Sequence, residues 1–336
     1  MVRGLMRRVL LIAAILAFAP RSSLAQADQV TMALPATSLT FSATYMAQDM
    51  GFWERQGLKV KLTLVSGIGA ANAVLAGSVE FSSGSGPTVI RANARGQKLF
   101  AIGNTIERPV VEVVLSRDIA EKLGLSEKSP VEKKASALRG LRMAVDSVNS
   151  VVHGYLKYVA RKGRVDPERE ITVTPMAPPN MLAALKSGAI DGFTMSLPWP
   201  LIPVQEGRAM RLVSSPRGDL PELNPFAYNL VITRHDFCDN KPNVCRALAA
   251  GYRQALDHLQ EKPKESLEVL RGRFAKMDPK VLAEAFELIR ASSTRTGKID
   301  EGGLDRAQEF MLAQGMIRAE ESLKSFASIY TNKFTQ

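Results

Sequence analysis

Apolar and polar residues along most of this chain follow a pattern that changes repeatedly between two spacings. Short alternating runs, typical of half-buried strands, are followed by runs with apolar residues three and four positions apart, typical of amphipathic helices. This order predicts mainly parallel sheets covered by helices. The predicted strands are 29–33, 59–64, 80–82, 99–104, 110–116, 141–145, 171–174, 190–194, 210–213 and 227–233, and the predicted helices are 41–54, 70–76, 87–95, 151–161 and 181–187.

The last third of the chain shows the helical spacing alone. Pro263 and Pro279 stand where the first turns of helices are expected, and Asp278 is a suitable N-cap for the second of these helices. The predicted helices are 244–259, 263–274, 279–289, 304–314 and 320–329.

The segment 45–64, YMAQDMGFWERQGLKVKLTL, combines both patterns. Tyr45, Met46 and Trp53 fall on one helical face, which favours packing as the role of Tyr45. Gly57 stands where a left-handed helix end is wanted, and an alternating strand follows it. The segment therefore predicts a helix, a turn and a half-buried strand.

Two segments of the chain are similar to one another. VLAGSVEF at 74–81 and LKSGAIDGF at 185–193 both predict a helix end that leads into a strand, with Gly192 as an additional residue in the second copy. Each strand is followed by a loop of small residues. Because ligands of open α/β sheets bind beyond the carboxyl ends of strands, we expect both loops to face a shared cleft.

The first residues have the features of a secretory signal. Arg3, Arg7 and Arg8 precede an apolar run that is short for a membrane span, and small residues at 23 and 25 suit a signal peptidase. We expect residues 1–25 to be removed and the mature protein to lie in the periplasm, the alternative being a membrane-anchoring helix. The net charge of +11 then falls to about +7. This excess is scattered among acidic residues, so no nucleic-acid partner is expected.

The chain has only two cysteines, Cys238 and Cys245. Export to an oxidising compartment favours a disulfide between them. The turn-forming residues that separate them would allow the two sulfurs to meet. No histidine pair lies near, so no metal site is predicted there, and the sequence indicates no cofactor.

Four loops between a predicted strand and a predicted helix are rich in Ser, Thr, Asn or Pro: 35–40, 82–87, 146–150 and 176–180. Such residues are good helix N-caps and need no other role. The same loops also offer free backbone N–H groups and hydroxyls, which can receive an anion or a polar ligand. Both interpretations stay open at this point. The four loops contain no lysine or arginine. Arg91 lies outside them, further along a predicted helix.

The segment GFWERQGLKVKL at 51–62, together with AGSVEF at 76–81, resembles the corresponding segments of the periplasmic solute-binding proteins of the nitrate, sulfonate, taurine and thiamine-precursor type. The segments LRGLRMAVDS and GRVDPEREITVTP support the resemblance. It implies a two-lobed α/β fold, the type II periplasmic binding protein, in which each lobe is a mainly parallel sheet flanked by helices. A C-terminal helical extension completes the predicted fold.

The resemblance also implies which loops hold the solute, namely the helix starts after three of the strands. Met195 and Trp199 are added from the loop after the second similar segment, although Trp199 is equally suited to the core. The candidate residues from the three helix starts are Ser38, Leu39, Thr40, Ser83, Gly84, Ser85, Ser147, Asn149 and Ser150.

We therefore expect one lobe to comprise residues 26–107 and 228–336 and the other residues 108–227, with crossovers near 106–112 and 222–229. The resemblance implies a monomeric receptor that binds a small solute and delivers it to an ABC transporter permease in the inner membrane. The alternative is an exported enzyme on the same scaffold, for which His153 and Asp191 are the only suitable acid–base candidates. The sequence has no paired nucleophile and base, so no catalytic residue is predicted.

Overall fold

The computed structural model describes residues 27–335. The predicted signal peptide, residues 1–25, lies outside the described residues, and so does Gln26. In the part of the chain that is described, no helix combines the length and apolar character needed to cross a bilayer.

The first of two sheets contains β1 (Asp28–Leu34), β2 (Leu58–Leu64), β3 (Phe81–Gly84), β4 (Leu99–Ile106) and β10 (Asn229–Arg234) in the order β2-β1-β3-β10-β4. β1 runs parallel to β2, with Asp28 opposite Leu58, and it also runs parallel to β3. β10 is antiparallel to both of its neighbours, so four of the five strands share one direction. β2 shows the predicted alternation, because Leu58 and Val60 are buried while the lysines beside them are exposed.

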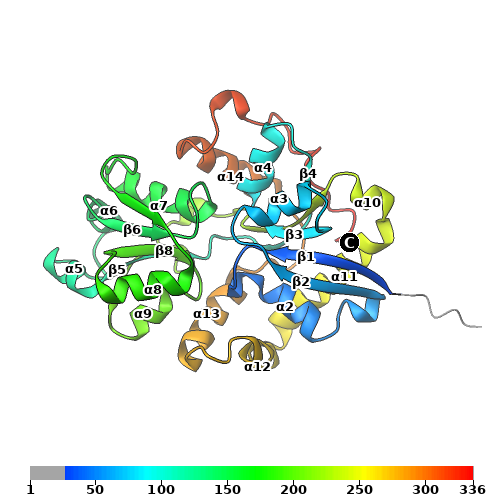
Figure 1. Cartoon of the computed structure of the whole chain (residues 1–336), viewed down its shortest axis with the longest axis horizontal. Coiled ribbons are helices and arrows are strands. Elements are labelled where there is room, and N and C mark those ends of the chain that lie inside the picture. The colour runs from blue at the N-terminus through cyan, green and yellow to red at the C-terminus, as the bar shows by residue number, and fades with distance from the viewer. Residues whose placement is uncertain (1–26, 336) are drawn as a thin grey trace, which may run out of the picture.

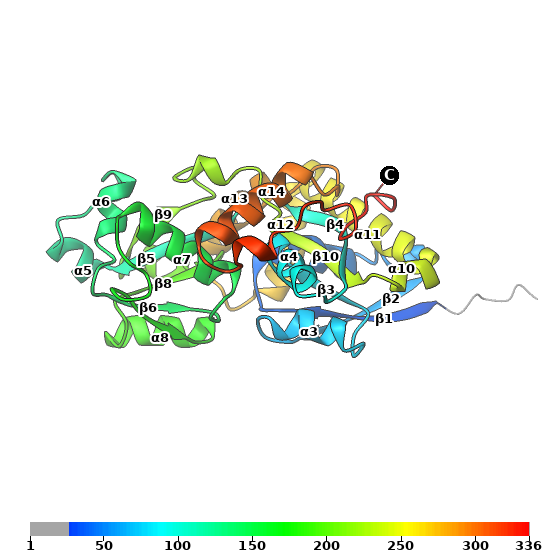
Figure 2. The ribbon, with the colours of Figure 1, turned by 90° about the horizontal axis from the view of Figure 1, so that it is seen from above.

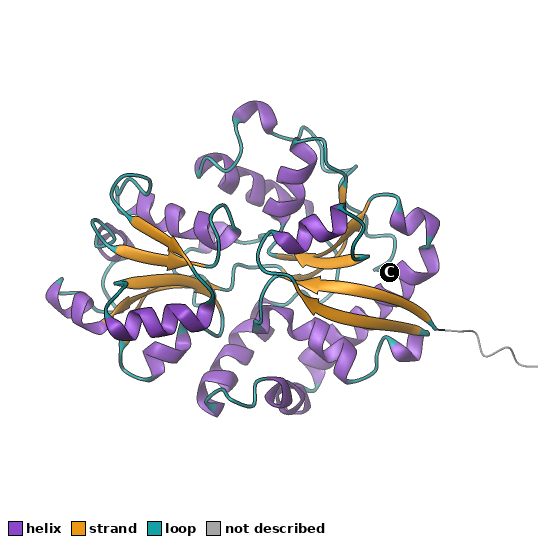
Figure 3. Ribbon diagram, viewed as in Figure 1, coloured by secondary structure: helices purple, strands orange, loops and turns teal. Residues whose placement is uncertain are grey.

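The second sheet contains β5 (Val111–Ser116), β6 (Arg142–Val145), β7 (Thr172–Pro175), β8 (Gly192–Ser196) and β9 (Ala209–Ser214) in the order β7-β6-β8-β5-β9. Here β5 is the reversed strand, antiparallel to both β8 and β9. The two sheets lie side by side, as Figure 1 and Figure 3 show. The prediction of two mainly parallel sheets flanked by helices is confirmed. We call each sheet with its covering helices the first lobe and the second lobe.

Helices cover both faces of each sheet. In Figure 1, α3 (Gly69–Leu75) and α4 (Gly86–Ala94) lie on one side of the first sheet, and α2 (Ser42–Asp49) lies on the other. The second lobe has α5 (Arg117–Lys122), α6 (Val131–Ser136), α7 (Val151–Lys162), α8 (Pro178–Ser187) and α9 (Leu201–Gln205). Three short 3-10 turns, η1 (Leu39–Phe41), η2 (Glu54–Gln56) and η3 (Pro221–Leu223), complete these lobes.

The single helix predicted over 41–54 is wrong in its extent, because the structure divides it into η1, α2 and η2. α2 ends at Asp49, just before Gly51 takes a left-handed conformation with φ +65°. Gly57 also takes the left-handed conformation predicted for it, with φ +73°. Trp53 is fully buried and donates its indole N–H to the Leu248 carbonyl at 3.1 Å. The family signature is therefore mostly scaffold.

The C-terminal helices are α10 (Phe237–Asn240), α11 (Pro242–Glu261), α12 (Pro263–Arg273), α13 (Pro279–Ser292) and α14 (Glu301–Ala313). α11 packs on α2 of the first lobe, whereas α14 contacts both α4 and α7 and so touches both lobes. In Figure 1, α14 lies above the space between the two sheets and α13 lies below it, and Figure 2 gives the view from above, with α14 nearer the viewer. Asp278 caps α13 as predicted, accepting from the N–H groups of Lys280 and Val281.

The helix predicted over 320–329 is wrong. Only η4 (Ala319–Glu321) forms there, and the chain then continues as an extended tail. The tail lies along the edge strand β4, where Ala101 donates its N–H to the Ile329 carbonyl and accepts from the N–H of Thr331, both at 2.9 Å. Pairing with an open sheet edge satisfies this backbone better than an isolated helix would.

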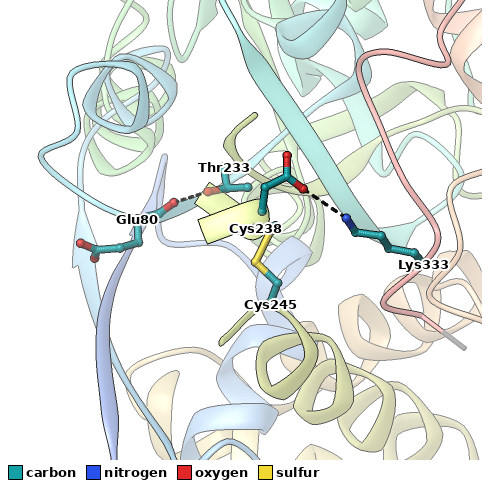
Figure 4. The surroundings of a disulfide bond; sticks show 6 residues. Glu80, Thr233, Cys238, Cys245 and Lys333 are labelled. Atoms are coloured by element: carbon teal, nitrogen blue, oxygen red, sulfur yellow. Dashed lines mark hydrogen bonds and ion pairs between the residues drawn. A yellow bond between two sulfur atoms is a disulfide. The ribbon is translucent and has the colours of Figure 1, made fainter. Parts of the chain in front are cut away.

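The predicted disulfide between Cys238 and Cys245 is present and joins α10 to α11 (Figure 4). Close to it, Lys333 of the C-terminal tail lies 3.4 Å from the Asp239 carboxylate. The bridge therefore closes a loop where the chain leaves the first sheet for the C-terminal helices.

The chain passes between the lobes through the segments that join β4 to β5 and η3 to β10. These two crossovers are hydrogen-bonded to one another. Phe226 donates its N–H to the Glu107 carbonyl at 2.9 Å, and Tyr228 donates to the Ile106 carbonyl at 3.2 Å. They therefore form a paired connection between the two lobes.

Candidate functional site

A cleft with an empty volume of about 750 Å³ lies between the two lobes. Its walls come from the loops at the carboxyl ends of β1, β3, β6 and β8. Tyr228 at the end of the second crossover and Asn229 at the start of β10 also line it. Seven of the residues predicted from the sequence line it: Ser38, Thr40, Ser83, Gly84, Ser85, Ser150 and Met195. The structure thus brings together four strand ends that are far apart in the sequence.

Serines start the helices on the first-lobe side of the cleft. The Ser38 hydroxyl accepts from the N–H of Thr40 at 3.1 Å, which caps η1. The Ser85 hydroxyl accepts from the N–H of Thr88 at 3.3 Å and caps α4, which has nine residues. These serines lie in the cleft wall because their helices start at its edge, so capping and ligand contact are compatible roles here.

The loop after β6 on the second-lobe side is organised around Asp146. One carboxylate oxygen, Oδ1, accepts from the N–H of Ser147 at 2.8 Å and from the hydroxyl of Ser150 at 2.6 Å. The Ser150 hydroxyl in turn accepts from the N–H of His153 at 3.0 Å and caps α7. This chain of short hydrogen bonds fixes the carboxylate in the cleft wall.

Three predicted residues lie next to the cleft and outside its lining. Leu39 is fully buried in the core. The Ser147 hydroxyl is buried, and no described residue bonds to it. Asn149 takes a left-handed conformation with φ +63° and donates its N–H to Nδ1 of His153 at 3.0 Å. A direct contact of these residues with a solute stays a prediction.

Trp199 is also outside the lining, and it connects the lobes. Its indole N–H donates to the Thr37 carbonyl of the first lobe at 3.0 Å. The Ser38 hydroxyl donates in the opposite direction, to the Leu197 carbonyl of the second lobe at 2.7 Å. These two hydrogen bonds hold the ends of the cleft walls against each other. Tyr45 packs edge-on against Phe274, with ring centres 5.9 Å apart, which agrees with the packing role expected for it.

Arg91 is a cleft residue that the sequence interpretation missed. It lies on α4 three positions after Thr88, so both side chains project from one helical face into the cleft. Its Nη1 donates across the lobes to the Asn149 carbonyl at 2.8 Å. The spacing of Arg91 from the Ser85 cap, read as a helical face, was the signal that could have found it.

Asp146 and Tyr228 also line the cleft without having been predicted as ligands. Burial raises the pKa of Asp146, although the hydrogen bonds from Ser150 and Ser147 oppose this effect. Burial lowers the pKa of Arg91, and the charge of Arg95 lowers it further. Burial raises the pKa of Tyr228. Its hydroxyl lies 2.7 Å from that of Ser196. The cleft therefore has a guanidinium on one wall and a carboxyl group on the other.

The two acid–base candidates named from the sequence lie outside the cleft lining. Asp191 is bound by Arg142 at 2.6 Å, and the hydrogen bonds from Arg142 lower the pKa of its carboxyl. Burial lowers the pKa of His153, and its Nδ1 is occupied by the N–H of Asn149. Within residues 27–335, no three His, Cys, Asp or Glu side chains are grouped as a metal site would require.

Known proteins with similar folds include two binding proteins of solved structure. The alkanesulfonate-binding protein SsuA from Xanthomonas axonopodis pv. citri, bound to MOPS, is 19% identical, with 92% of this chain and 99% of that chain covered and a TM-score of 0.71. The periplasmic nitrate-binding protein NrtA from Synechocystis PCC 6803 is 15% identical, with 77% and 70% covered and a TM-score of 0.63. At these identities the likeness concerns the fold.

Sequence comparison adds a curated relative, the bicarbonate transport ATP-binding protein CmpC from Synechocystis sp., which is 25% identical over 233 residues. The match covers 67% of this chain and 34% of the relative, so this chain spans about a third of that protein's length. A family model, described as the NMT1-like family, matches residues 25–270. Because this match includes both sheets and the cleft, the chain belongs to the NMT1-like family.

Proposed function

We propose that this protein is an extracytoplasmic solute receptor. It binds a small molecule of the sulfonate, nitrate, pyrimidine or carboxylate type in the cleft between its lobes and delivers it to an ABC permease in the inner membrane. It acts in the periplasm as a monomer, after removal of its signal peptide, and its two lobes are residues 26–107 with 228–336 and residues 108–227.

The observation that carries this proposal is the cleft itself. Helix starts from both lobes converge on it, and Arg91 supplies a guanidinium that no described carboxylate neutralises. Helix N-termini and a partly desolvated guanidinium suit an acidic group of a solute. Ile68, Val151 and Met195 add apolar wall, which suits the remainder of a small organic molecule.

The cross-lobe hydrogen bonds support a receptor that closes on its solute. Arg91 bonds to Asn149 of the opposite lobe, and Trp199 bonds to the backbone of Thr37. A solute that contacts both walls favours this closed arrangement over an open one by its difference in affinity for the two states. The closed arrangement is then the form that a permease recognises.

The alternative of an exported enzyme has weaker support. Asp191 is held by Arg142, and His153 is buried in a loop with Nδ1 engaged. Neither side chain lines the cleft, so neither is placed to move a proton of a bound solute.

Binding to the purified mature protein tests the proposal. We expect stoichiometric thermal stabilisation by at least one compound among sulfonates, nitrate, pyrimidines and aromatic carboxylates, with the compound recovered unchanged. We expect Arg91→Gln to weaken the binding of an acidic hit roughly tenfold or more, because it removes a charge-assisted hydrogen bond in a partly desolvated site. Isothermal titration calorimetry measures the dissociation constants of the unaltered protein and of the variant.

Arg95→Gln is the matched control. Arg95 is the C-cap residue of α4, four positions after Arg91, its side chain is 56% exposed, and it pairs with Glu321. We expect this variant to bind like the unaltered protein. Chemical conversion of the hit would contradict the receptor function, and equal effects of the two substitutions would contradict the role of Arg91.

A further inference from the structure

Only one of the two oxygens of the Asp146 carboxyl group accepts hydrogen bonds from its own loop. Oδ1 accepts both hydrogen bonds that the loop provides, from Ser147 and from Ser150. No described residue donates to Oδ2, and Asp146 lines the cleft. The second lobe therefore presents an acceptor to whatever occupies the cleft.

Arg91 presents the opposite chemistry from the first lobe. Nη1 bonds to the Asn149 carbonyl, while no described residue accepts from Nε or Nη2. Arg91 and Asp146 do not form a hydrogen bond with one another in the described residues. A donor from the first lobe and an acceptor from the second lobe thus line the same cleft.

We propose that Asp146 is a specificity-determining residue, which selects a solute carrying a hydrogen-bond donor, best an amino or ammonium group, besides the acidic group that Arg91 receives. This inference rests on the proposed receptor function and specifies its solute. An anion with acceptors alone, such as nitrate or an unsubstituted alkanesulfonate, would leave Oδ2 facing like charge or an empty site.

The physical reason is the cost of an unpaired carboxylate in a closed cleft. Closure of the lobes removes water from Oδ2. A buried charged acceptor that has no donor then costs free energy, and this cost opposes the binding of a solute without a donor group. An ammonium group placed at Oδ2 forms a charge-assisted hydrogen bond instead. Selection therefore comes from rejecting the solute that lacks the donor as much as from binding the one that has it.

Matched pairs of probes test this inference by isothermal titration calorimetry at pH 7. The pairs are 2-aminoethanesulfonate with ethanesulfonate, and 3-aminopropanoate with propanoate. We expect the amino compound of at least one pair to bind roughly tenfold or more tightly than its partner. In Asp146→Asn the new amide N–H₂ donates where Oδ2 accepted, so we expect the preference to vanish and the plain anion to gain affinity.

Asp191→Asn is the matched control, since it makes the same change in the same lobe outside the cleft. We expect it to keep the preference for the amino compound, with circular dichroism confirming that both variants fold. Plain anions that bind as well as their amino partners would overturn the role of Asp146 and leave the receptor function standing. Plain anions that bind more tightly than their amino partners would also overturn it, because they would show that Asp146 is protonated and donates to the anion. Binding by neither member of either pair would overturn this inference, and only failure of the wider solute panel as well would overturn the receptor.

Discussion

The two lobes have the same arrangement of strands, and they differ in what their loops bring to the cleft. The orders β2-β1-β3-β10-β4 and β7-β6-β8-β5-β9 correspond position by position, with the reversed strand fourth in each sheet. In both lobes that reversed strand adjoins a crossover. The loop after β1 offers Ser38, whereas the equivalent loop after β6 offers Asp146 beside Ser150. A common scaffold thus supports walls of different charge, and this difference is the basis of the selection that we propose for the cleft.

The similar segments 74–81 and 185–193 occupy equivalent places, from α3 into β3 and from α8 into β8. The second copy has the additional Gly192, and the structure shows why it is glycine. A Cβ atom at this position would collide with the carbonyl oxygen of Val114 on β5. In the second lobe, the reversed strand β5 therefore passes β8 too closely for a side chain.

The largest effect that we expect comes from Gly192→Ala. The added methyl group must displace backbone rather than a flexible side chain, so we expect the free energy of unfolding to fall by about 3 kcal/mol or more. Gly272→Ala in α12 is the control, because apart from the adjoining residues and the backbone of the helix itself no atom lies within 4 Å of a Cβ there. Urea unfolding followed by circular dichroism measures both. Equal stability of the two variants would contradict the close approach of β5 and β8.

The capping serines provide a direct comparison of the two walls. Each accepts one backbone N–H, but Ser38 donates to the Leu197 carbonyl and Ser150 donates to the Asp146 carboxylate. Because hydrogen bonds to charged groups are worth more, we expect Ser150→Ala to cost roughly 2–3 kcal/mol and Ser38→Ala roughly 1–2 kcal/mol. Urea unfolding at pH 7 measures the difference. A larger loss for Ser38→Ala would show that the contact between the lobes outweighs the carboxylate.

The smallest effect that we expect is a pH dependence of stability that comes from Asp146 in the second lobe. Because burial raises the pKa of Asp146, the folded protein holds this proton at pH values where the unfolded chain has lost it. Asp146 therefore costs stability as the pH rises from about 4, its range in unfolded chains, through the folded value. We expect the advantage of Asp146→Asn over the unaltered protein to grow across this window in thermal melts.

Ser38→Ala serves as the control for this pH dependence. Its loop carries no carboxyl group, so its difference from the unaltered protein stays constant over the same range. Glu112, whose pKa burial also raises, is present in every protein compared and cancels in the differences. A constant difference for Asp146→Asn would contradict the raised pKa.

Local pattern predicted most of the scaffold. Alternation placed most strands to within a few residues, and proline, glycine and Asp278 located helix ends, because these signals depend on the conformation of a few consecutive residues. Prediction failed where a contact from a distant part of the chain decided the backbone. Residues 320–329 have helical spacing, yet the open edge of β4 binds this segment in extended form.

The sequence by itself determined the α/β class, the family signature, the capping serines and the disulfide, since only two cysteines are available. Only the tertiary structure decided which side chains share the cleft. Arg91 reads as an ordinary helical residue until α4 places it opposite Asn149, and Asp146 reads as a turn residue until its loop faces α4. The reason is that periodicity records one element and its burial, whereas the charge of a binding site comes from residues that folding brings together from separate elements.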